Sequence, residues 1–270
     1  MLDLGFYGLS LNPFEKNSML GRMSFGSRDH KKALDAMEAA VKRNGFALVT
    51  AKSGLGKSHV VDRFIQSIDL SAHVVSYISP GRTTLIELYR QLSIEFKLEP
   101  FGNKQKLINS IRRFLYSTYT RGKPAIIIID EAQDLKPDIL SELRILMSYD
   151  HDTLDVFTLI LAGEPKLASN IQNNELLDSL RQRITNHYQF IGLSDEEISS
   201  YVSHKLEFAG GSNIIIDDKA MKTLCEASRG VSRTIDHIMC DALIWGIQMQ
   251  RPTIDSEVMQ HAVDSQSLLA

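Results

Sequence analysis

The stretch FALVTAKSGLGKSHVVDRFIQSI, residues 46–68, combines three local patterns that together decide the fold. Residues 46–50 form a continuous apolar run, which is typical of a strand buried on both faces of a parallel sheet. The glycine-containing residues 51–57 follow as a tight turn, and residues 57–68 then place apolar side chains at helical spacing. Strand, loop and helix in this order predict one step of a parallel α/β sheet.

The loop differs at one position from the phosphate-binding pattern G-x-x-x-x-G-K-[ST], because Ala51 stands at the first glycine. A methyl group is tolerated there if the backbone φ is negative, since only a positive φ makes glycine nearly obligatory. The flanking strand and helix are those that a phosphate loop requires, whereas the alternative is a glycine-rich turn without a ligand. We therefore expect an ATP site formed by Ser53, Gly54, Leu55, Gly56, Lys57, Ser58 and His59.

Within this loop, backbone N–H groups at the helix N-terminus would bind the phosphates. Lys57 would reach the β- and γ-phosphate oxygens, and the Ser58 hydroxyl would bind Mg²⁺. The expected cofactors are therefore ATP and Mg²⁺.

A second motif, AIIIIDEAQDL at residues 125–135, supplies carboxylates for the same site. Four isoleucines indicate a buried strand, and acidic residues at the carboxyl end of such a strand lie where open α/β sheets bind ligands. Asp130 is the expected Mg²⁺-linked carboxylate, and Glu131 is expected to polarise the attacking water. The alternative is an acidic strand end that caps the next helix. Both motifs together predict an ATPase that forms ADP and phosphate.

Apolar runs and helical patterns alternate along the first part of the chain. Further strands are expected at residues 73–78, 157–162 and about 187–191, with helices at 30–43, 85–96, 104–119 and 137–148. From Ser194, whose capping box with Glu197 begins a helix, only helical patterns follow. The predicted fold class is α/β, a parallel sheet flanked by helices. We predict an α/β nucleotide-binding core at residues 1–193 and a small helical bundle at 194–270.

Composition limits the classes of protein and of partner. The net charge of −3 excludes a chain that is basic throughout, although a local basic surface remains compatible with it. Cys225 and Cys240 are too few for a disulfide framework. No apolar run approaches the roughly 20 residues that span a bilayer, and the N-terminus lacks the features of a signal peptide. These features predict a cytoplasmic protein.

Several blocks of the chain resemble the ExeA/TniB/TnsC group of AAA+ ATPases. They are FYGLSLNPFE (6–15), HKKALDAMEAAVKRNGFALVTAKSGLGKS (30–58), IIIIDEAQDL (126–135), LILAGEPKL (159–167), LLDSLRQRITNHYQFIGLSDEEISSYVSHKLEFAG (176–210) and ASRGVSRTIDHIMCDAL (227–243). The resemblance covers nearly the whole chain. It implies an AAA+ P-loop NTPase fold with a C-terminal helical lid.

The same resemblance implies roles for residues outside the two motifs. Asn12, Pro13 and Phe14 resemble a segment that lies near the adenine. Arg233 resembles the sensor-2 arginine that contacts the γ-phosphate, although a surface arginine at a helix start is the alternative. Either of two arginines would be the finger that a neighbouring subunit inserts, with a solvated face or a nucleic-acid contact as the alternative: Arg181 and Arg183.

One residue departs from the group. Glu164 stands where the group has glutamine and where many AAA+ proteins carry a polar sensor-1 residue, and a carboxylate near the γ-phosphate would be repelled. It is expected to slow hydrolysis or to point away from the site. His30 and Lys31 are expected at the edge of the nucleotide.

Two kinds of protein in this group suggest two functions. Secretion ATPases of the ExeA type continue into a membrane span, whereas transposition regulators end near the lid, as this chain does at Ala270. We therefore expect an ATP-dependent regulator of transposition. It would oligomerise as a ring or filament on double-stranded target DNA and act with a transposase and a target-selection protein, without a membrane. A soluble ExeA-like ATPase for secretion or envelope assembly, or a nucleotide-gated scaffold that barely hydrolyses ATP, are the alternatives.

A DNA surface is expected within residues 79–123. From Lys104 to Lys123 there are six basic residues and no acidic one, and lysine and arginine contacts to phosphates supply sequence-independent affinity. The alternative is a solvated amphipathic helix with no ligand. The candidate DNA-binding residues are Arg82, Thr83, Thr84, Lys104, Lys106, Arg112, Arg113 and Arg121.

Overall fold

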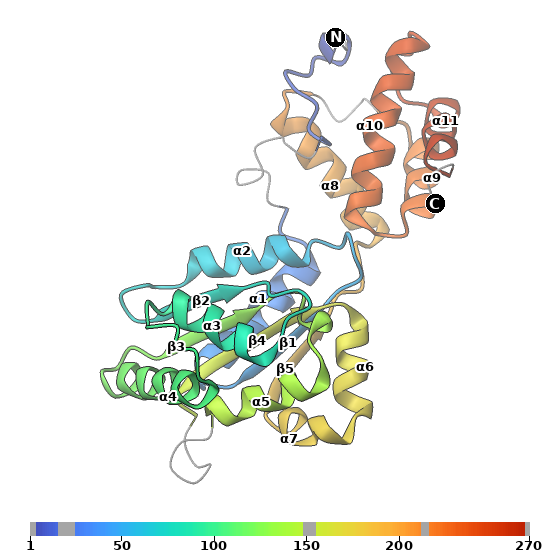
Figure 1. Ribbon diagram of the computed structural model, residues 1–270. Coiled ribbons are helices and arrows are strands. Elements are labelled where there is room, and N and C mark those ends of the chain that lie inside the picture. Colours follow the sequence, from blue (N-terminus) through green and yellow to red (C-terminus); the bar gives the residue numbers. More distant parts are fainter. Residues whose placement is uncertain (1–3, 16–24, 148–154, 212–215, 268–270) are drawn as a thin grey trace. The chain divides into compact units, whose positions relative to one another are not determined.

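The computed structural model describes residues 4–15, 25–147, 155–211 and 216–267. The chain divides into two compact units. His30–Phe190 form an α/β unit, and Met1–Asp29 together with Ile191–Ala270 form a helical unit (Figure 1). Each unit has its own hydrophobic core.

The α/β unit contains a five-stranded sheet in the order β2-β3-β4-β1-β5, and every pairing is parallel. The strands are β1 (Phe46–Thr50), β2 (Val74–Ile78), β3 (Ala125–Ile129), β4 (Phe157–Gly163) and β5 (Ile184–Gln189). The three central strands are buried along their whole length, as their apolar runs predict. The predicted parallel sheet is therefore confirmed.

The last strand was predicted two to three residues too late. Residues 187–191 were expected, whereas β5 spans Ile184–Gln189 and alternates between half-buried and exposed side chains. It lies at the edge of the sheet, where one face is solvated. A search for continuous apolar runs misses such a strand because its sequence, ITNHYQ, is mostly polar.

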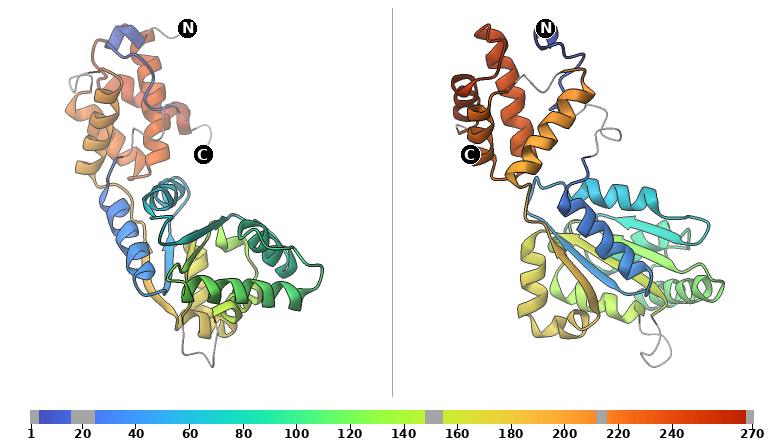
Figure 2. Two further views of the ribbon diagram at one scale, coloured as in Figure 1. Left: turned by 90° about the vertical axis from the view of Figure 1, so that its left-hand side faces the viewer. Right: turned by 180° about the vertical axis from the view of Figure 1, so that it is seen from behind.

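Helices cover both faces of the sheet (Figure 2). One face is covered by α1 (Arg28–Val41) and α2 (Lys57–Ser67), and the other by α3 (Leu85–Glu95), α4 (Lys104–Thr120), α5 (Pro137–Met147), α6 (Pro165–Asn173) and α7 (Asp178–Arg181). The chain crosses the sheet in one direction through α2 and returns through the later helices. Right-handed crossovers therefore place α2 on the opposite face from α3 to α7.

The helical unit contains α8 (Asp195–Phe208), α9 (Asp218–Ser228), α10 (Ser232–Gln248) and α11 (Ser256–Ser267). The predicted capping box is present, because Ser194 accepts from the Glu197 N–H and the Glu197 carboxylate accepts from the Ser194 N–H. Short 3₁₀ turns at Leu4–Tyr7, Ala132–Asp134 and Glu175–Leu177 complete the described elements. In the described ranges no helix is both long and apolar enough to cross a membrane.

Residues 4–15, which the sequence analysis assigned to the core of residues 1–193, pack into the helical unit. Tyr7, Leu9 and Phe14 are buried there among side chains of α8 and α10. The Tyr7 hydroxyl also donates to the carbonyl of Arg251. The division of function between a nucleotide-binding core and a lid stays a prediction.

Candidate nucleotide site

The glycine-containing loop joins β1 to α2 as the sequence predicts. Gly54 and Gly56 have φ angles of 86° and 89°, which L side chains rarely adopt. Ala51 is not among the described non-glycine residues with positive φ, so its methyl group meets the condition stated above. Its N–H donates to the Gly163 carbonyl at 3.0 Å, which extends the pairing of β1 with β4. Gly56 is the N-cap of α2 and offers no side chain to the helix N-terminus.

Lys57 is the centre of the site. Its side chain is buried, and the ammonium contacts Asp130 and lies 3.0 Å from Glu131 Oε1. Asp130 follows β3 and is only 2% exposed. A buried ammonium and a buried carboxylate stabilise each other only as a pair, because either charge alone would be costly to desolvate. The two motifs of the sequence therefore meet at the carboxyl ends of β1 and β3.

Asp130 also accepts hydrogen bonds from two hydroxyl groups. Ser58 Oγ and the Tyr77 hydroxyl each donate to Asp130 Oδ2 at 3.3 Å. Burial and the Asp130 charge raise the pKa of Tyr77 to about 12, so Tyr77 is a neutral donor at physiological pH. Sequence reasoning missed Tyr77, because β2 is an edge strand whose neighbour becomes known only from the sheet order. Ser58 and Asp130 together supply oxygen ligands of the kind that Mg²⁺ prefers.

Glu131 has an unusual backbone and a well-defined carboxylate. Its φ of 52° lies in the left-handed region, and it precedes the 3₁₀ turn Ala132–Asp134. Gln133 Nε2 donates to Glu131 Oε2 at 2.6 Å, and Lys57 binds the other oxygen. The Gln133 hydrogen bond, with a contribution from Lys57, lowers the pKa of Glu131 below its ordinary value. Gln133 was also missed by sequence reasoning, because residues two apart share no face of a helix.

Glu164 lies at the end of β4, as the N-cap of α6. Its N–H donates to Gln133 Oε1 at 3.0 Å, and its carboxylate is 3.5 Å from the Lys166 ammonium. Glu164 therefore contacts Gln133 through its backbone N–H, whereas its carboxylate pairs with Lys166. Its predicted effect on hydrolysis stays a prediction.

Two histidines lie beside the loop. The rings of His30 and His59 are 5.6 Å apart, and the His30 ring also packs on Phe190. A Cβ atom at Gly56 would lie 3.1 Å from His30 Nε2, so the ring rests against the loop backbone. Burial, aided by Arg63, lowers the pKa of His59 and favours its neutral form. Lys31 is exposed on α1.

Four predicted nucleotide contacts belong to the helical unit. Asn12, Pro13 and Phe14 are buried in it, where Asn12 Nδ2 donates to Cys240 Sγ at 3.0 Å and the Lys205 ammonium lies over the Phe14 ring. Arg233 is exposed near the start of α10. Their roles toward the adenine and the γ-phosphate stay predictions.

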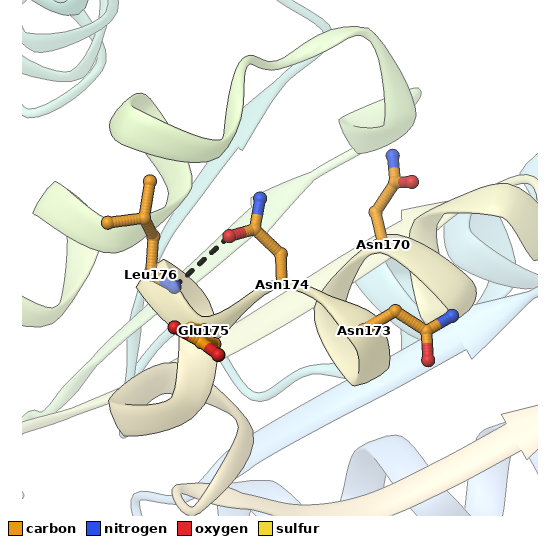
Figure 3. Close-up of a pocket in the computed structure, with 5 residues that line it drawn as sticks. All are labelled: Asn170, Asn173, Asn174, Glu175 and Leu176. Carbon is orange, nitrogen blue, oxygen red and sulfur yellow. Dashed lines mark hydrogen bonds between the residues drawn. The ribbon is translucent and has the colours of Figure 1, made fainter.

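The two finger candidates form contacts within the α/β unit. Arg181 donates to the Gln172 carbonyl at 2.6 Å and pairs with Asp178, whereas Arg183 pairs with Asp155. Arg181 is the more exposed of the two arginines. A shallow hollow on the adjoining segment is lined by Asn170, Asn173, Asn174, Glu175 and Leu176, and Asn174 Oδ1 accepts the Leu176 N–H at 3.1 Å (Figure 3). None of these lining residues belongs to the phosphate loop or to the end of β3.

The candidate DNA-binding residues differ in their surroundings. Thr83 and Thr84 bind Glu87, and Thr84 forms the capping box of α3, so both hydroxyls stabilise that helix. Lys104 is 3.3 Å from Glu142 of α5. Arg112 is half-buried. Five of the basic candidates are exposed: Arg82, Lys104, Lys106, Arg113 and Arg121.

Comparison with known proteins gives a family match within the α/β unit. Residues 40–171 match the family model described as an AAA domain. General secretion pathway protein A of Aeromonas hydrophila is 31% identical over 242 residues, which are 88% of this chain and 44% of that protein. The chain thus spans less than half the length of this relative.

Solved structures of low sequence identity share the fold. The ORC2 protein of Aeropyrum pernix, in ADPNP–ADP complexes, has a TM-score of 0.65 at 11% identity, with 94% of this chain and 71% of that chain covered. Cdc6p of Pyrobaculum aerophilum has a TM-score of 0.66 at 14% identity, covering 90% and 67%. The RuvB Holliday junction branch migration motor of Thermotoga maritima has a TM-score of 0.52 at 19% identity, covering 89% and 69%. The fold is that of the AAA+ P-loop ATPases.

Proposed function

We propose that this chain, whose residues 40–171 carry an AAA domain, binds Mg²⁺–ATP and hydrolyses it to ADP and phosphate. The observation that carries the proposal is the meeting of the Lys57 ammonium with the Asp130 and Glu131 carboxylates beside the start of α2. A helix N-terminus favours an anion, and a mobile cationic side chain next to it can turn toward phosphate oxygens.

The residues present fit the nucleotide and the metal. Lys57 would leave the carboxylates to bind phosphate oxygens, while Ser58 and Asp130 would hold Mg²⁺. When bound, Mg²⁺ neutralises the charge that develops on the phosphates. Glu131, with two further acceptor sites on its carboxylate, would orient and polarise the water.

The proposal predicts turnover that depends on the metal. Phosphate release from ATP by the unsubstituted protein should require Mg²⁺ and cease in excess chelator, because the site then lacks the cation that neutralises the phosphates. The measurement is a phosphate-release assay alongside fluorescence titration with a labelled ATP analogue. Lys52→Ala, at an exposed position of the same loop, is the matched control and should behave as the unsubstituted protein. Tight binding without turnover at any Mg²⁺ concentration would replace the ATPase with a nucleotide-gated scaffold.

For the biological role, we infer first an ATPase that serves a secretion or envelope system. The support is the 31% identity with General secretion pathway protein A over most of this chain. The name of that relative concerns a protein more than twice as long as the matching region, so the role of this chain in secretion is a proposal. Self-assembly, with Arg181 or Arg183 reaching the ATP of a neighbouring subunit, belongs to the same proposal.

A second role, the regulation of transposition on double-stranded DNA, is favoured by the basic segment of residues 104–123. Lys106, Arg113 and Arg121 expose their side chains there, and the segment contains no acidic residue. Phosphate contacts by such residues would give duplex affinity without base readout. A transposase and a target-selection protein would be the further partners.

Charge reversal separates the two roles. If α4 binds DNA, Lys106→Glu, Arg113→Glu and Arg121→Glu together should weaken duplex binding in the presence of a slowly hydrolysed ATP analogue and make it less sensitive to salt. Each phosphate contact contributes a slope of about −0.9 to log K against log salt on B-DNA, so three lost contacts should flatten it by about 2.7. Fluorescence anisotropy measures the affinity, and electron microscopy shows whether rings or filaments form on the duplex.

The control for this triple variant reverses three exposed basic residues in or just after α1: Lys32, Lys42 and Arg43. It changes the net charge by the same amount and should retain any DNA binding. Equal loss in both triple variants would mean that net charge, and not α4, determines the affinity. No duplex binding by the unsubstituted protein, together with sedimentation on membranes, would remove the transposition role and favour secretion.

A further inference from the structure

The Glu131 carboxylate has two partners, and one of them is also needed elsewhere. Lys57 lies 3.0 Å from Oε1, and Gln133 Nε2 lies 2.6 Å from Oε2. In the proposed reaction the Lys57 ammonium turns to the phosphates, where its charge is required. Gln133 is then the group that continues to hold the carboxylate, whose side chain is 42% exposed. Without it, the carboxylate would rotate in solvent.

Gln133 is itself oriented at both ends. Its nitrogen donates to Glu131, and its oxygen accepts the Glu164 N–H at 3.0 Å. A side-chain amide with different partners on its oxygen and nitrogen has one favourable orientation, because a flip would oppose like groups at both ends. The Glu164 N–H belongs to the junction of β4 and α6, so this amide connects the end of β3 to the end of β4.

The fold leaves space for this amide. A Cβ atom at Gly163 would lie 2.6 Å from Gln133 Oε1 and 2.9 Å from Leu167 Cδ2, closer than real Cβ contacts allow. Gly163 is thus the position in β4 at which a side chain would displace Gln133. Glu131 itself has a left-handed backbone, with a φ of 52°, directly before the turn that contains Gln133.

We infer that Gln133 is a positioning residue for hydrolysis, which holds the Glu131 carboxylate toward the attacking water and anchors it to the β4–α6 junction. This inference rests on the proposed ATPase activity and adds to it a residue that touches neither phosphate nor metal. The donor end of the amide acts on Glu131, and the acceptor end supplies the anchor.

Gln133→Glu separates these two ends, because it keeps an acceptor oxygen for the Glu164 N–H and replaces the donor with a second oxygen. Facing Glu131 with a carboxylate, it should lower kcat by roughly 100-fold, the cost of misplacing a reacting group by about 1 Å. The Kd for ATP should stay within about threefold, since Lys57 and Ser58 are unchanged. Gln133→Met, an apolar side chain of similar length, should also lower kcat. Gln105→Glu, at an exposed position of α4, is the matched control.

The measurements are phosphate release under saturating ATP and fluorescence titration of the labelled nucleotide, which reports both Kd and folding. If Gln133→Glu turns over as the unsubstituted protein while Gln133→Met does not, the amide is only a structural link and the inference is wrong. If both Gln133 variants fail to bind nucleotide, the inference is tested with Gly163→Ala, whose added methyl group would displace Gln133 from the side of β4. A kcat equal to that of the unsubstituted protein would then overturn the inference. Absence of turnover in the unsubstituted protein would overturn the proposed ATPase and the inference together.

Discussion

Glu131→Gln should bind ATP with nearly unchanged affinity and hydrolyse it about 10²- to 10⁴-fold more slowly, the usual contribution of a positioned general base. The substitution keeps the shape of the side chain and an oxygen that can accept from Gln133. It removes the negative charge that would polarise water, while the contact of Lys57 with Asp130 is retained. Loss in kcat at constant Kd marks an interaction that matters only in the transition state.

Single-turnover phosphate release with excess protein is the sharpest measurement for this variant, because it excludes effects of product release. Glu175→Gln is the control, an exposed glutamate in the hollow of Figure 3. A Glu131→Gln protein that hydrolyses ATP at the original rate would assign water activation to a different group. The accumulated ATP-bound state would also trap any assembly that depends on ATP.

Lys57→Ala should lose nucleotide affinity instead. A hydrogen bond to a charged group contributes about 1.5–3 kcal/mol, so the Kd for ATP should rise roughly 10- to 100-fold. The substitution has a second effect, because it leaves Asp130 buried without its cation. Removing one partner of a buried ion pair costs about 3–5 kcal/mol, so the unfolding temperature should also fall.

These two effects separate in a titration with metal. Mg²⁺ alone should raise the unfolding temperature of Lys57→Ala, because Asp130 and Ser58 can bind the cation that replaces the ammonium. ATP should add little to this rise. Differential scanning fluorimetry with Mg²⁺, with ATP and with both measures it, and Lys52→Ala is again the control. An unchanged ATP affinity in Lys57→Ala would show that the nucleotide binds elsewhere.

Much of the fold follows from local patterns in the chain. The apolar runs at residues 46–50 and 125–129 coincide with β1 and β3, and the helices at 57–68 and 85–96 differ from α2 and α3 only at their ends. These elements have strong periodicity, and the turns between them have glycine or capping residues. β5 was misplaced because an edge strand lacks a continuous apolar run.

The candidate site likewise has residues that the sequence identifies and neighbours that only the fold supplies. Lys57, Ser58, Asp130 and Glu131 belong to motifs whose chemistry is local, so the sequence alone determined which residues they are. Their grouping follows from a parallel sheet, whose strands all end at one edge. The neighbours of these residues do not follow from the sequence. Tyr77 and Gly163 come close to the site because of the order of the strands in the sheet, which sequence spacing does not give.

The sequence by itself thus determined a glycine-containing loop between a strand and a helix, a strand that ends in two carboxylates and the alternation that leads to a parallel sheet. Only the tertiary structure decided that Gln133 links Glu131 to the end of β4, that Thr83 and Thr84 stabilise α3, and that residues 4–15 pack with the helical unit. The reason is physical. Backbone periodicity is set by neighbours along the chain, whereas the direction of a polar side chain is set by hydrogen-bond partners that the fold brings from distant segments.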